Sequence, residues 1–322
     1  YPNIYELVHG TEPTNESSLP SAAFFVQAGS TNTGDGSEGN PFNAIQPALD
    51  AAEYWDIVHV RAGTYVSSRD FGLNLRGKPL MLVAPSGCVI SCRSGFSGFC
   101  LSQGEGALSI IRGFVVRGGT NGIECKSGSS PSIQNCTLID NVEAGIGCRS
   151  GSSPVIENCT IVENRKHGLA CYDASAPFIR NSILWGNSFN QILNSNSAPV
   201  LTHTCIQGGW EGSGNISTNP AIVPFSGRLS SLSPCIDAGS TNGLPMDRDG
   251  EFRVSIVDMG ADEFVDNDND GMADAWELAC FGDLSRDGES DEDGDGLTDR
   301  EECGKGTDPR KMDTDEDGVS DG

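Results

Sequence analysis

The sequence has few aromatic residues, few histidines and no long apolar runs. Aromatic residues make up 7% of its 322 residues, which argues against a large aromatic-lined pocket. No segment approaches the run of about 18 apolar residues that indicates a membrane-spanning helix. The four histidines and the lack of paired CxxC motifs exclude a structural zinc site. The first residue is not Met, which indicates a processed or trimmed chain.

The formal charge of −25 is concentrated at one end of the chain. Residues 262–322 hold 23 Asp and Glu against 5 Lys and Arg, a net charge of −18, and the preceding residues carry the remaining −7. Such acidity argues against nucleic acid as a partner. A block this acidic is either disordered or neutralised by bound metal ions.

Twelve cysteines are many for a chain without a zinc motif. Proteins of the reducing cytosol seldom carry so many, so we expect a secreted chain with disulfide bridges. The 41 glycines indicate many tight turns.

A period of 23 residues dominates residues 122–209. Three copies follow one another: GIECKSGSSPSIQNCTLIDN, GIGCRSGSSPVIENCTIVEN and GLACYDASAPFIRNSILWGN. Equivalent positions hold Cys125, Cys148 and Cys171; Pro131, Pro154 and Pro177; and Asn135, Asn158 and Asn181. A degenerate copy follows through Pro199 and Leu201, with His203 at the Asn position, and an earlier one runs through Ile110, Val115 and Gly118. Self-similarity at a fixed period of this length indicates a solenoid.

Each repeat predicts three short strands and no helix. Short pieces of Val, Ile, Thr and Cys are broken by Gly, Ser, Asn and Pro, and the strands are the GIxC, PxIxN and CTLID pieces. Ile123 and Cys125 share one strand face, and Glu124 and Lys126 share the other. The pattern predicts an all-β fold, a single-stranded parallel β-helix of about 23 residues per turn, in which successive turns pair about 4.8 Å apart.

Stacking of such turns places like residues on like. Ile133, Ile156 and Ile179 are expected to form an inner aliphatic ladder. Asn141, Asn164 and Asn187 are expected at a turn, because Asn tolerates the left-handed backbone. Asn135, Asn158 and Asn181 are expected to form a side-chain amide ladder, although the Asn-Cys-Thr triplets also match glycosylation sequons.

Cysteines on adjacent turns lie within disulfide reach, because a spacing of about 4.8 Å falls in the allowed Cα range. The stacked candidates are Cys136 with Cys159, Cys148 with Cys171, and Cys100 with Cys125. Cys205 with Cys235, and Cys280 with Cys303, are candidates that would close the ends. The alternative for the stacked pairs is a ladder of free thiols packed as small apolar side chains.

The acidic end repeats a metal-binding pattern, DxDxDGxxDxxE. Carboxylates at alternate positions around a loop that folds at Gly supply the oxygens that calcium requires, and the seventh position adds a backbone carbonyl. The first copy comprises Asp266, Asp268, Asp270, Met272, Asp274 and Glu277. The second comprises Asp291, Asp293, Asp295, Leu297, Asp299 and Glu302, and a partial third comprises Asp313, Asp315, Asp317, Val319 and Asp321. Of the flanking segments, only residues 272–280 are predicted to be helical.

Residues 22–264 resemble the secreted bacterial proteins that carry right-handed parallel β-helix repeats, the pectate-lyase-like fold. DGSEGNPFNAIQPALDAAEYWDIVHVRAGTY resembles the N-terminal part of that family, which implies a short helix over residues 44–52 that covers the open end of the coil. NISTNPAIV, LSSLSPCIDAGS and DRDGEFRVSIVDMGADEF resemble its C-terminal closing pattern. The family holds lyases, hydrolases, adhesins and structural proteins, so the resemblance implies an architecture and leaves function open.

Residues 265–322 resemble the calcium-binding repeats of thrombospondin type 3 and their bacterial relatives, in which ions replace the apolar core. The resemblance implies bound Ca²⁺ in a small, loop-rich module, which chelation would melt. The N-terminal arm, residues 1–21, is expected to be a linker or a strand donated to another subunit.

Two functional hypotheses follow. The first is a structural or adhesive protein on a bacterial cell surface, with the β-helix as a stiff rod and possible contacts between copies as a filament subunit. The second is a polysaccharide lyase, or a carbohydrate-binding protein, acting on an anionic polysaccharide along the outer face of the GIxC strands. There Lys126, Arg149 and Tyr172 would stack on consecutive turns, neutralise a uronate and move protons. The composition favours the first hypothesis, because turns such as SGSS build no long cleft.

Overall fold

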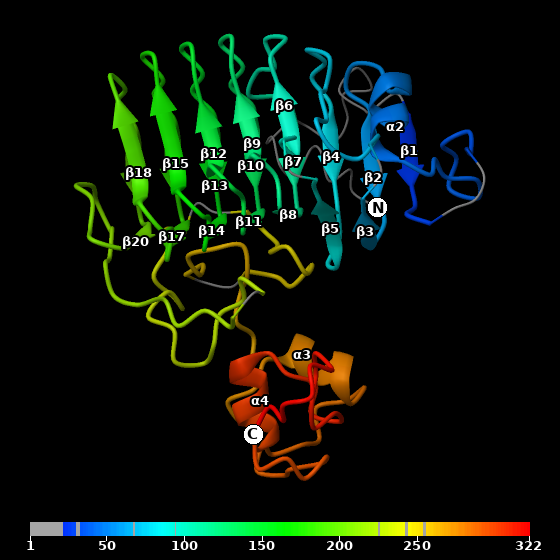
Figure 1. Ribbon diagram of the computed structural model, residues 1–322, viewed down its shortest axis with the longest axis vertical. Coiled ribbons are helices and arrows are strands. Elements are labelled where there is room, and N and C mark those ends of the chain that lie inside the picture. Colours follow the sequence, from blue (N-terminus) through cyan, green and yellow to red (C-terminus); the bar gives the residue numbers. More distant parts are fainter. Residues whose placement is uncertain are drawn as a thin grey trace.

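The computed structural model describes residues 22–29, 33–66, 68–93, 95–224, 226–241, 244–253 and 256–322. Three parallel sheets wind into a coil, and the acidic end, with α3 and α4, forms a small body to one side of it (Figure 1). The N-terminal arm, residues 1–21, lies outside the described residues.

Each of the five turns from β4 (Met81–Val83) to β18 (Asn190–Ser195) contributes one strand to each sheet, and the turns at the two ends contribute to the first two sheets only. The first sheet contains β1 (Ala23–Val26), β2 (Ile57–Val60), β4 (Met81–Val83), β7 (Ile110–Arg112), β10 (Ser132–Gln134), β13 (Val155–Glu157), β16 (Phe178–Arg180) and β19 (Val200–Thr202). The second contains β3 (Gly63–Tyr65), β5 (Cys88–Ser91), β8 (Val115–Arg117), β11 (Thr137–Ile139), β14 (Thr160–Val162), β17 (Ile183–Trp185) and β20 (Cys205–Ile206). The third contains β6 (Phe99–Leu101), β9 (Asn121–Cys125), β12 (Ala144–Cys148), β15 (His167–Tyr172) and β18 (Asn190–Ser195).

The 23-residue period sets the register of the sheets. Ile133 pairs with Ile156 in the first sheet, Thr137 with Thr160 in the second, and Cys148 with Cys171 in the third. Because the period is kept from turn to turn, identical side chains meet in parallel, in-register strands. The three predicted strands per repeat are confirmed.

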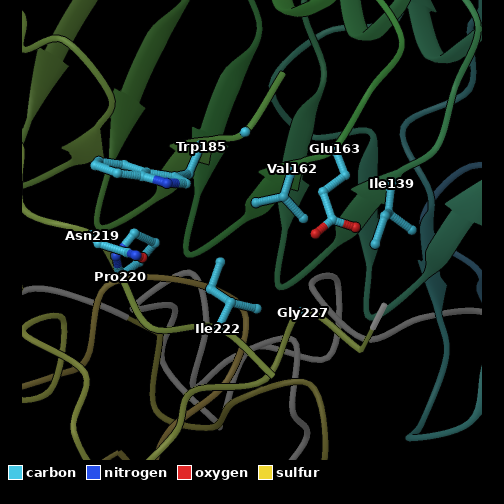
Figure 2. A pocket seen from close by; sticks show the side chains of 9 residues that line it. Ile139, Val162, Glu163, Trp185, Asn219, Pro220, Ile222 and Gly227 are labelled. Atoms are coloured by element: carbon cyan, nitrogen blue, oxygen red, sulfur yellow. The ribbon is translucent and has the colours of Figure 1, made fainter. Parts of the chain in front are cut away.

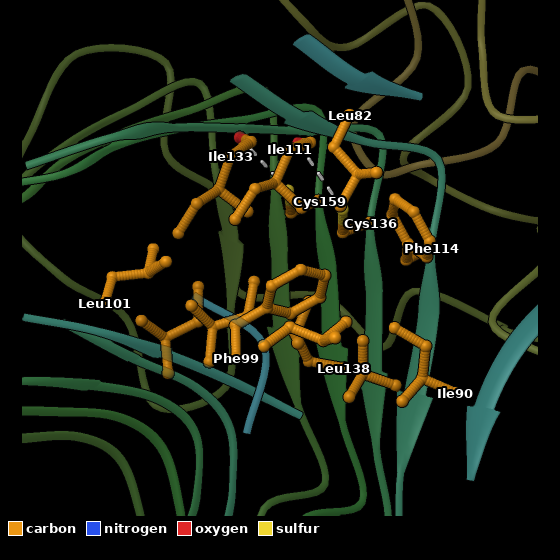
Figure 3. Packing of buried hydrophobic residues seen from close by; sticks show 14 of the residues in the cluster. Leu82, Ile90, Phe99, Leu101, Ile111, Phe114, Ile133, Cys136, Leu138 and Cys159 are labelled. Carbon is orange, nitrogen blue, oxygen red and sulfur yellow. Dashed lines mark hydrogen bonds between the residues drawn. The ribbon is translucent and has the colours of Figure 1, made fainter. Parts of the chain in front are cut away.

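The core is a set of aliphatic columns along the coil axis (Figure 3). Ile111, Ile133, Ile156 and Ile179 are each 0% exposed and form the predicted inner ladder. Full burial of one such side chain contributes roughly 1.5–3 kcal/mol. In the early turns, Phe99 and Phe114 fill the interior with their rings 5.6 Å apart in an edge-on arrangement.

The two asparagine columns have exchanged the roles that we expected of them. Asn141, Asn164 and Asn187 form the buried amide ladder: the Nδ2 group of Asn141 donates to Oδ1 of Asn164 at 3.0 Å, and that of Asn164 to Oδ1 of Asn187 at 2.8 Å. The left-handed backbone falls one residue earlier, at Asp140 and Glu163, with φ of 51° and 53°. The expectation that the ladder asparagines themselves take the left-handed turn was therefore wrong.

Glycines make room for this ladder on the neighbouring strand. A Cβ atom at Gly145 would lie 3.0 Å from Nδ2 of Asn164, and one at Gly168 would lie 2.7 Å from Nδ2 of Asn187. The repeated Gly before each Ile or Leu of the GIxC strand is therefore required by close packing against the amides.

The second asparagine column binds the C-terminal part of the β-helix domain, which packs along the side of the coil. This part is called the closing segment here, and its described residues are 226–241, 244–253 and 256–264. Asn135, Asn158 and Asn181 have φ between 47° and 49°, and His203, at the equivalent position, has 47°. Their Nδ2 groups donate to backbone carbonyls of the closing segment: Asn135 to Met246, Asn158 to Asp258 and Asn181 to Ser240. The amide ladder predicted for this column is therefore wrong, and the sequon asparagines are buried beneath the segment, at 1% exposure or less.

A buried ion pair also fastens the closing segment. The Nη1 atom of Arg253 lies 2.8 Å from Oε2 of Glu263, and Arg253 also donates to the carbonyl of Gly260 at 3.0 Å. Arg248 reaches the coil itself, because its Nη1 donates to Oγ1 of Thr137 at 2.7 Å. The segment thus binds several turns side by side.

The predicted helix over residues 44–52 is confirmed as α2 (Ile45–Ala51) at the first turns, with Ala44 and Ala52 as its flanking cap residues. Its buried residues are Ile45, Ala48 and Leu49, and Pro47 falls in the first turn, where a missing N–H is tolerated. The strand edge of β1 is covered as well, by a segment in which Phe42 donates to the carbonyl of Phe25 at 2.9 Å.

None of the twelve cysteines, all of which lie in the described part of the chain, is bonded to another. Cys148 and Cys171 face each other in register, and the thiols of Cys136 and Cys159 donate to the carbonyls of Ile111 and Ile133 (Figure 3). Cys100 pairs with Glu124 and not with Cys125, which pairs with Leu101. The expected stacking of Cys100 on Cys125 is thus one residue out of register, and the other candidate bridges stay predictions.

We expect Asn164→Ala to destabilise the coil by about 3 kcal/mol or more. The substitution leaves the N–H of Asn141 and several carbonyls without partners, at roughly 1–3 kcal/mol for each buried group. The measurement is the midpoint of guanidinium unfolding. The control is Asn194→Ala, an exposed position on β18, where the change should stay within about 0.5 kcal/mol. Equal midpoints for the two variants would contradict the ladder.

We expect a thiol reagent at pH 8 to modify only the three half-buried cysteines, Cys92, Cys100 and Cys280, before the protein unfolds. The other nine are buried and out of reach of the reagent. Burial raises the pKa of the half-buried Cys92 and Cys280 as it does that of Cys88 and Cys125, so accessibility separates the two groups. Mass spectrometry of the labelled native chain measures this, and early labelling of Cys136 would refute it. Any cysteine that stays unlabelled after unfolding without reductant would belong to one of the candidate bridges.

Candidate metal centre

Three acidic loops at the C-terminal end share one backbone arrangement. In each, the N–H of the glycine donates to the first aspartate of the pattern: Gly271 to Asp266 at 3.0 Å, Gly296 to Asp291 at 3.2 Å and Gly318 to Asp313 at 2.8 Å. The residue after the glycine donates to the third aspartate, at 2.8–2.9 Å in all three loops. The glycines have φ of 91°, 104° and 93°, a conformation that other residues rarely adopt. The loops therefore curl their carboxylates inward.

The first loop is the most completely closed. Carboxylate oxygens of Asp268, Asp270 and Glu277 lie within 4.8 Å of one another, as do those of Asp266, Asp268 and Asp274. Asp274 and Glu277 project from α3 (Asp274–Cys280), three residues apart and hence on one helix face. This places five of the predicted side-chain ligands together, and Met272, whose carbonyl was predicted as a ligand, is buried beside them.

Glu277 is the most informative of these residues. It is 0% exposed, and neither carboxylate oxygen has a hydrogen-bond partner among the described residues. Burial first, and then the charges of Asp270, Asp268 and the other aspartates, raise its pKa to about 7. A buried carboxylate surrounded by like charges is costly unless a cation compensates it.

The second loop is more open. Asp291, Asp293 and Asp295 gather within 4.8 Å, whereas Asp299 and Glu302 are buried on α4 (Asp299–Lys305) at 0% exposure. One oxygen of Asp299 lies 3.4 Å from Nη1 of Arg286, and its other oxygen has no partner within the part of the chain described.

Glu302 and Leu297 complete the predicted set of the second loop. Glu302 accepts a hydrogen bond from Oγ1 of Thr307 at 3.1 Å through one oxygen, and its other oxygen lacks a partner among described residues. Burial first, and then nearby aspartates, raise its pKa to about 7. Leu297 is 9% exposed at the seventh position.

The sequence interpretation missed α4. Its signal is a capping box: Thr298 accepts from the N–H of Glu301, and the Glu301 side chain accepts from the N–H of Thr298. Gly306 ends the helix in the left-handed conformation, with φ of 78°. Thr-x-x-Glu followed by Gly was therefore a readable signal for this helix.

The third loop gathers Asp313, Asp315 and Asp317 within 4.8 Å. Asp321 accepts from the N–H of Thr314 at 3.0 Å, as Asp274 accepts from the N–H of Asn267 at 2.9 Å in the first loop. Val319 is 69% exposed, in contrast to the buried Met272, so this loop has less apolar support.

The donor set of the loops fits a hard divalent cation. All the predicted ligand atoms are carboxylate or carbonyl oxygens, the donors that calcium prefers, and several of the buried oxygens have no partner among the described residues. Bound calcium would supply positive charge at the centre of each loop.

A further acidic group was not predicted: Asp247, Asp249 and Glu251 in the closing segment. This group has its own cation, because Nη1 of Arg228 lies 2.8 Å from Asp249 and 3.5 Å from Asp262. It therefore belongs to the packing of the closing segment against the coil.

The structure brings Lys126, Arg149 and Tyr172 together on the outer face of the third sheet. Their charges are already engaged: Lys126 lies 3.5 Å and Arg149 3.8 Å from the carboxylate of Glu124. The guanidinium of Arg149 lies over the Tyr172 ring, 4.5 Å from its centroid. The strip therefore carries less free positive charge than the sequence suggested.

A hollow of about 140 Å³ separates the second sheet from Asn219, Pro220, Ile222 and Gly227 (Figure 2). Val162, Ile139 and Trp185 line the sheet side, and Ile222 faces them. Glu163 is the one acidic side chain among its lining residues, so the hollow lacks the pair of carboxylates that glycoside hydrolysis requires.

Two family models agree with this architecture. Residues 66–206 match the family model of the right handed beta helix region, and residues 266–282 and 291–311 match that of the bacterial TSP3 repeat. Among solved structures, the chain is similar to the crystal structure of pectate lyase Pel9A, with 13% identity, a TM-score of 0.43, and coverage of 77% of this chain and 98% of that one. No curated protein matches the chain. Among the described residues, no helix has the length and apolar character needed to cross a membrane.

The match to the β-helix family covers the coil whose turns stack with a 23-residue period, and the repeat matches cover the first two acidic loops. The chain is therefore a right-handed parallel β-helix protein that carries bacterial TSP3 repeats.

Proposed function

We propose that the chain is an extracellular structural or adhesive protein, in which a β-helix rod (residues 22–264) is joined to a calcium-stabilised module (residues 265–322). The observation that carries the proposal is Glu277, a fully buried carboxylate without a hydrogen-bond partner in the described part of the chain, next to Asp268 and Asp270. TSP3 repeats are a class that binds calcium.

Each loop residue would have a defined role around the ion. Asp266, Asp268, Asp270 and Glu277 would bind through carboxylate oxygens, and Met272 through its carbonyl. The same roles in the second loop fall to Asp291, Asp293, Asp295, Glu302 and Leu297. Asp274 and Asp299, at the ninth position, would add a carboxylate directly or through a water molecule, and would also fix the helix to the loop. The incomplete third loop would use Asp313, Asp315, Asp317, Val319 and Asp321.

The surface of the coil supports a rod more than an enzyme. Basic side chains are paired with acids of the preceding turn, as in Lys166 with Glu143 at 2.6 Å and Arg165 with Asp140 at 2.9 Å. Exposed pairs of this kind contribute little stability but leave a surface of balanced charge. Millimolar calcium outside cells would keep the loops filled, so the ions would be structural. Such a rod would present a surface polysaccharide, or other copies of itself, with a stiff scaffold.

We expect a chelator to melt the acidic module and leave the coil folded. Without a cation, the carboxylates of residues 262–322, whose net charge is −18, repel one another. The coil has its own apolar core and does not depend on the ion. The measurement is thermal unfolding of the full chain by circular dichroism with calcium and with excess EDTA. We predict a low-temperature transition that EDTA removes and a main transition that it leaves in place. Identical curves would refute the calcium role.

We expect Glu277→Gln to weaken calcium binding at the first loop by at least tenfold. The variant keeps the shape of the side chain and removes its charge from the loop. Isothermal titration calorimetry measures the affinity. The control is Glu211→Gln, an exposed position outside the module, which should bind calcium as the wild type does. Wild-type affinity in Glu277→Gln would remove this residue from the ligand set.

The alternative is a lyase or binding protein for anionic polysaccharide, favoured by the stacking of Lys126, Arg149 and Tyr172 on one outer face. Its test is the absorbance of unsaturated uronate released from alginate, pectate and glycosaminoglycans. Since Glu124 lies within 3.8 Å of both cations and leaves the strip with only one net positive charge, we expect no product. Product formation that Lys126→Ala and Arg149→Ala abolish would establish the lyase and overturn the structural proposal.

A further inference from the structure

A groove of about 420 Å³ lies at the last turn of the coil. One wall is formed by residues 187–192, the turn before β18 and the start of that strand, and the other by residues 206–210. Figure 1 shows β18 as the last strand of its sheet, with the chain after β20 turning back beside it. The groove therefore lies where the repeating features of the coil come to an end.

The last residue of the amide ladder, Asn187, lines this groove. The Nδ2 group of Asn187 donates to Oε1 of Gln191 at 2.5 Å, and Nε2 of Gln191 donates to Oε1 of Gln207 at 3.1 Å. The same Gln207 oxygen accepts from the N–H of Gly186 at 2.9 Å. The Nε2 group of Gln207 has no partner among the described residues, and the Gln207 side chain is exposed. The groove thus presents a fixed amide donor, because the oxygen of the same amide accepts hydrogen bonds from Gln191 and from the N–H of Gly186.

An aromatic ring stands beside this donor. Phe189 is 71% exposed, and its ring centroid lies 6.2 Å from that of His167 on the preceding turn. Trp210 is half-buried and packs against the core from the opposite wall. A large apolar ring held in the open by the adjacent backbone is a surface on which the C–H face of a sugar ring can pack.

The chemistry of the lining selects the charge of the ligand. The eleven residues that line the groove include no Asp, Glu, Lys or Arg, and amide groups come from Asn187, Asn190, Gln191 and Gln207. Uncharged donors and acceptors beside an aromatic ring suit hydroxyl groups and offer nothing to a carboxylate. This contrasts with the charged strip at Lys126 and Arg149 on the same sheet.

A peptide strand is a poorer occupant. Strand addition requires a free edge on β18, but Gly208, Gly209 and Trp210 stand across the groove from Asn190 and Ile192, where the next strand would pair. Trp210 packs against the same core as Ile192, so this wall is fixed by apolar contact.

We propose that this groove binds a neutral oligosaccharide, with a sugar ring on Phe189 and its hydroxyls on the amides of Gln207 and Asn190. The site is separate from the calcium loops, so it adds a recognition function to the rod.

The test is isothermal titration of the full chain, in calcium, with cellohexaose, xylohexaose, laminarihexaose and mannohexaose, and with hexagalacturonate as the anionic comparison. We expect at least one neutral hexasaccharide to bind, and hexagalacturonate to bind at least tenfold more weakly. Phe189→Ala and Gln207→Ala should each weaken binding by about tenfold or more. The matched control is Phe178→Ala, an aromatic residue of the same turn on the first sheet that is 37% exposed, which should bind as the wild type does.

Three results would overturn the proposal. No binding of any neutral hexasaccharide is one, and unchanged affinity in both Phe189→Ala and Gln207→Ala is another. The third is retention of linear peptides from a displayed library when none of the glycans binds, since the groove would then accept a strand. Circular dichroism of each variant confirms that the coil is folded, so a loss of binding is not confused with unfolding.

Discussion

The in-register stacking of like residues is the constraint on which the rest of the molecule depends. Parallel pairing at a fixed 23-residue offset places Asn141, Asn164 and Asn187 directly above one another, and their amides satisfy both each other and the backbone of the turns. A shift of one residue would turn these polar groups out of their column and point apolar side chains outward. The ladder thus fixes the register, and the aliphatic columns supply most of the burial energy.

The coil and the acidic module are stabilised by different interactions. The coil must cover its side and its strand edges, which α2 and the closing segment do through ordinary packing, hydrogen bonds and the buried pair of Arg253 and Glu263. The acidic module has few apolar residues to bury and holds its loops through glycine turns that direct carboxylates inward. We infer that a bound cation would take the place of an apolar core in that module, whereas the coil buries aliphatic columns.

Much of the fold could be predicted from the sequence, because residues at equivalent positions of a repeat occupy equivalent places in successive turns. The three strands and the isoleucine ladder followed from period and alternation, and α2 followed from the resemblance of the N-terminal segment to the β-helix family. The roles of the two asparagine columns followed from neither. Both columns recur at the same spacing, and only the path of the closing segment decides that Asn135 lies under it while Asn141 lies inside. Cys100 was misplaced because the spacing to Cys125 differs from the period. In the module, loop ligands followed from the pattern, but α4 and the hold of Arg286 on Asp299 depend on contacts that the pattern does not encode.

Hydrogen exchange of side-chain amides tests the stacking account most directly. NMR of the folded chain in deuterated water should show the Nδ2 protons of Asn141, Asn164 and Asn187 exchanging only through global unfolding, as slowly as the backbone amides of the inner strands. Exchange of these three groups as fast as that of the exposed Asn194 would contradict the account.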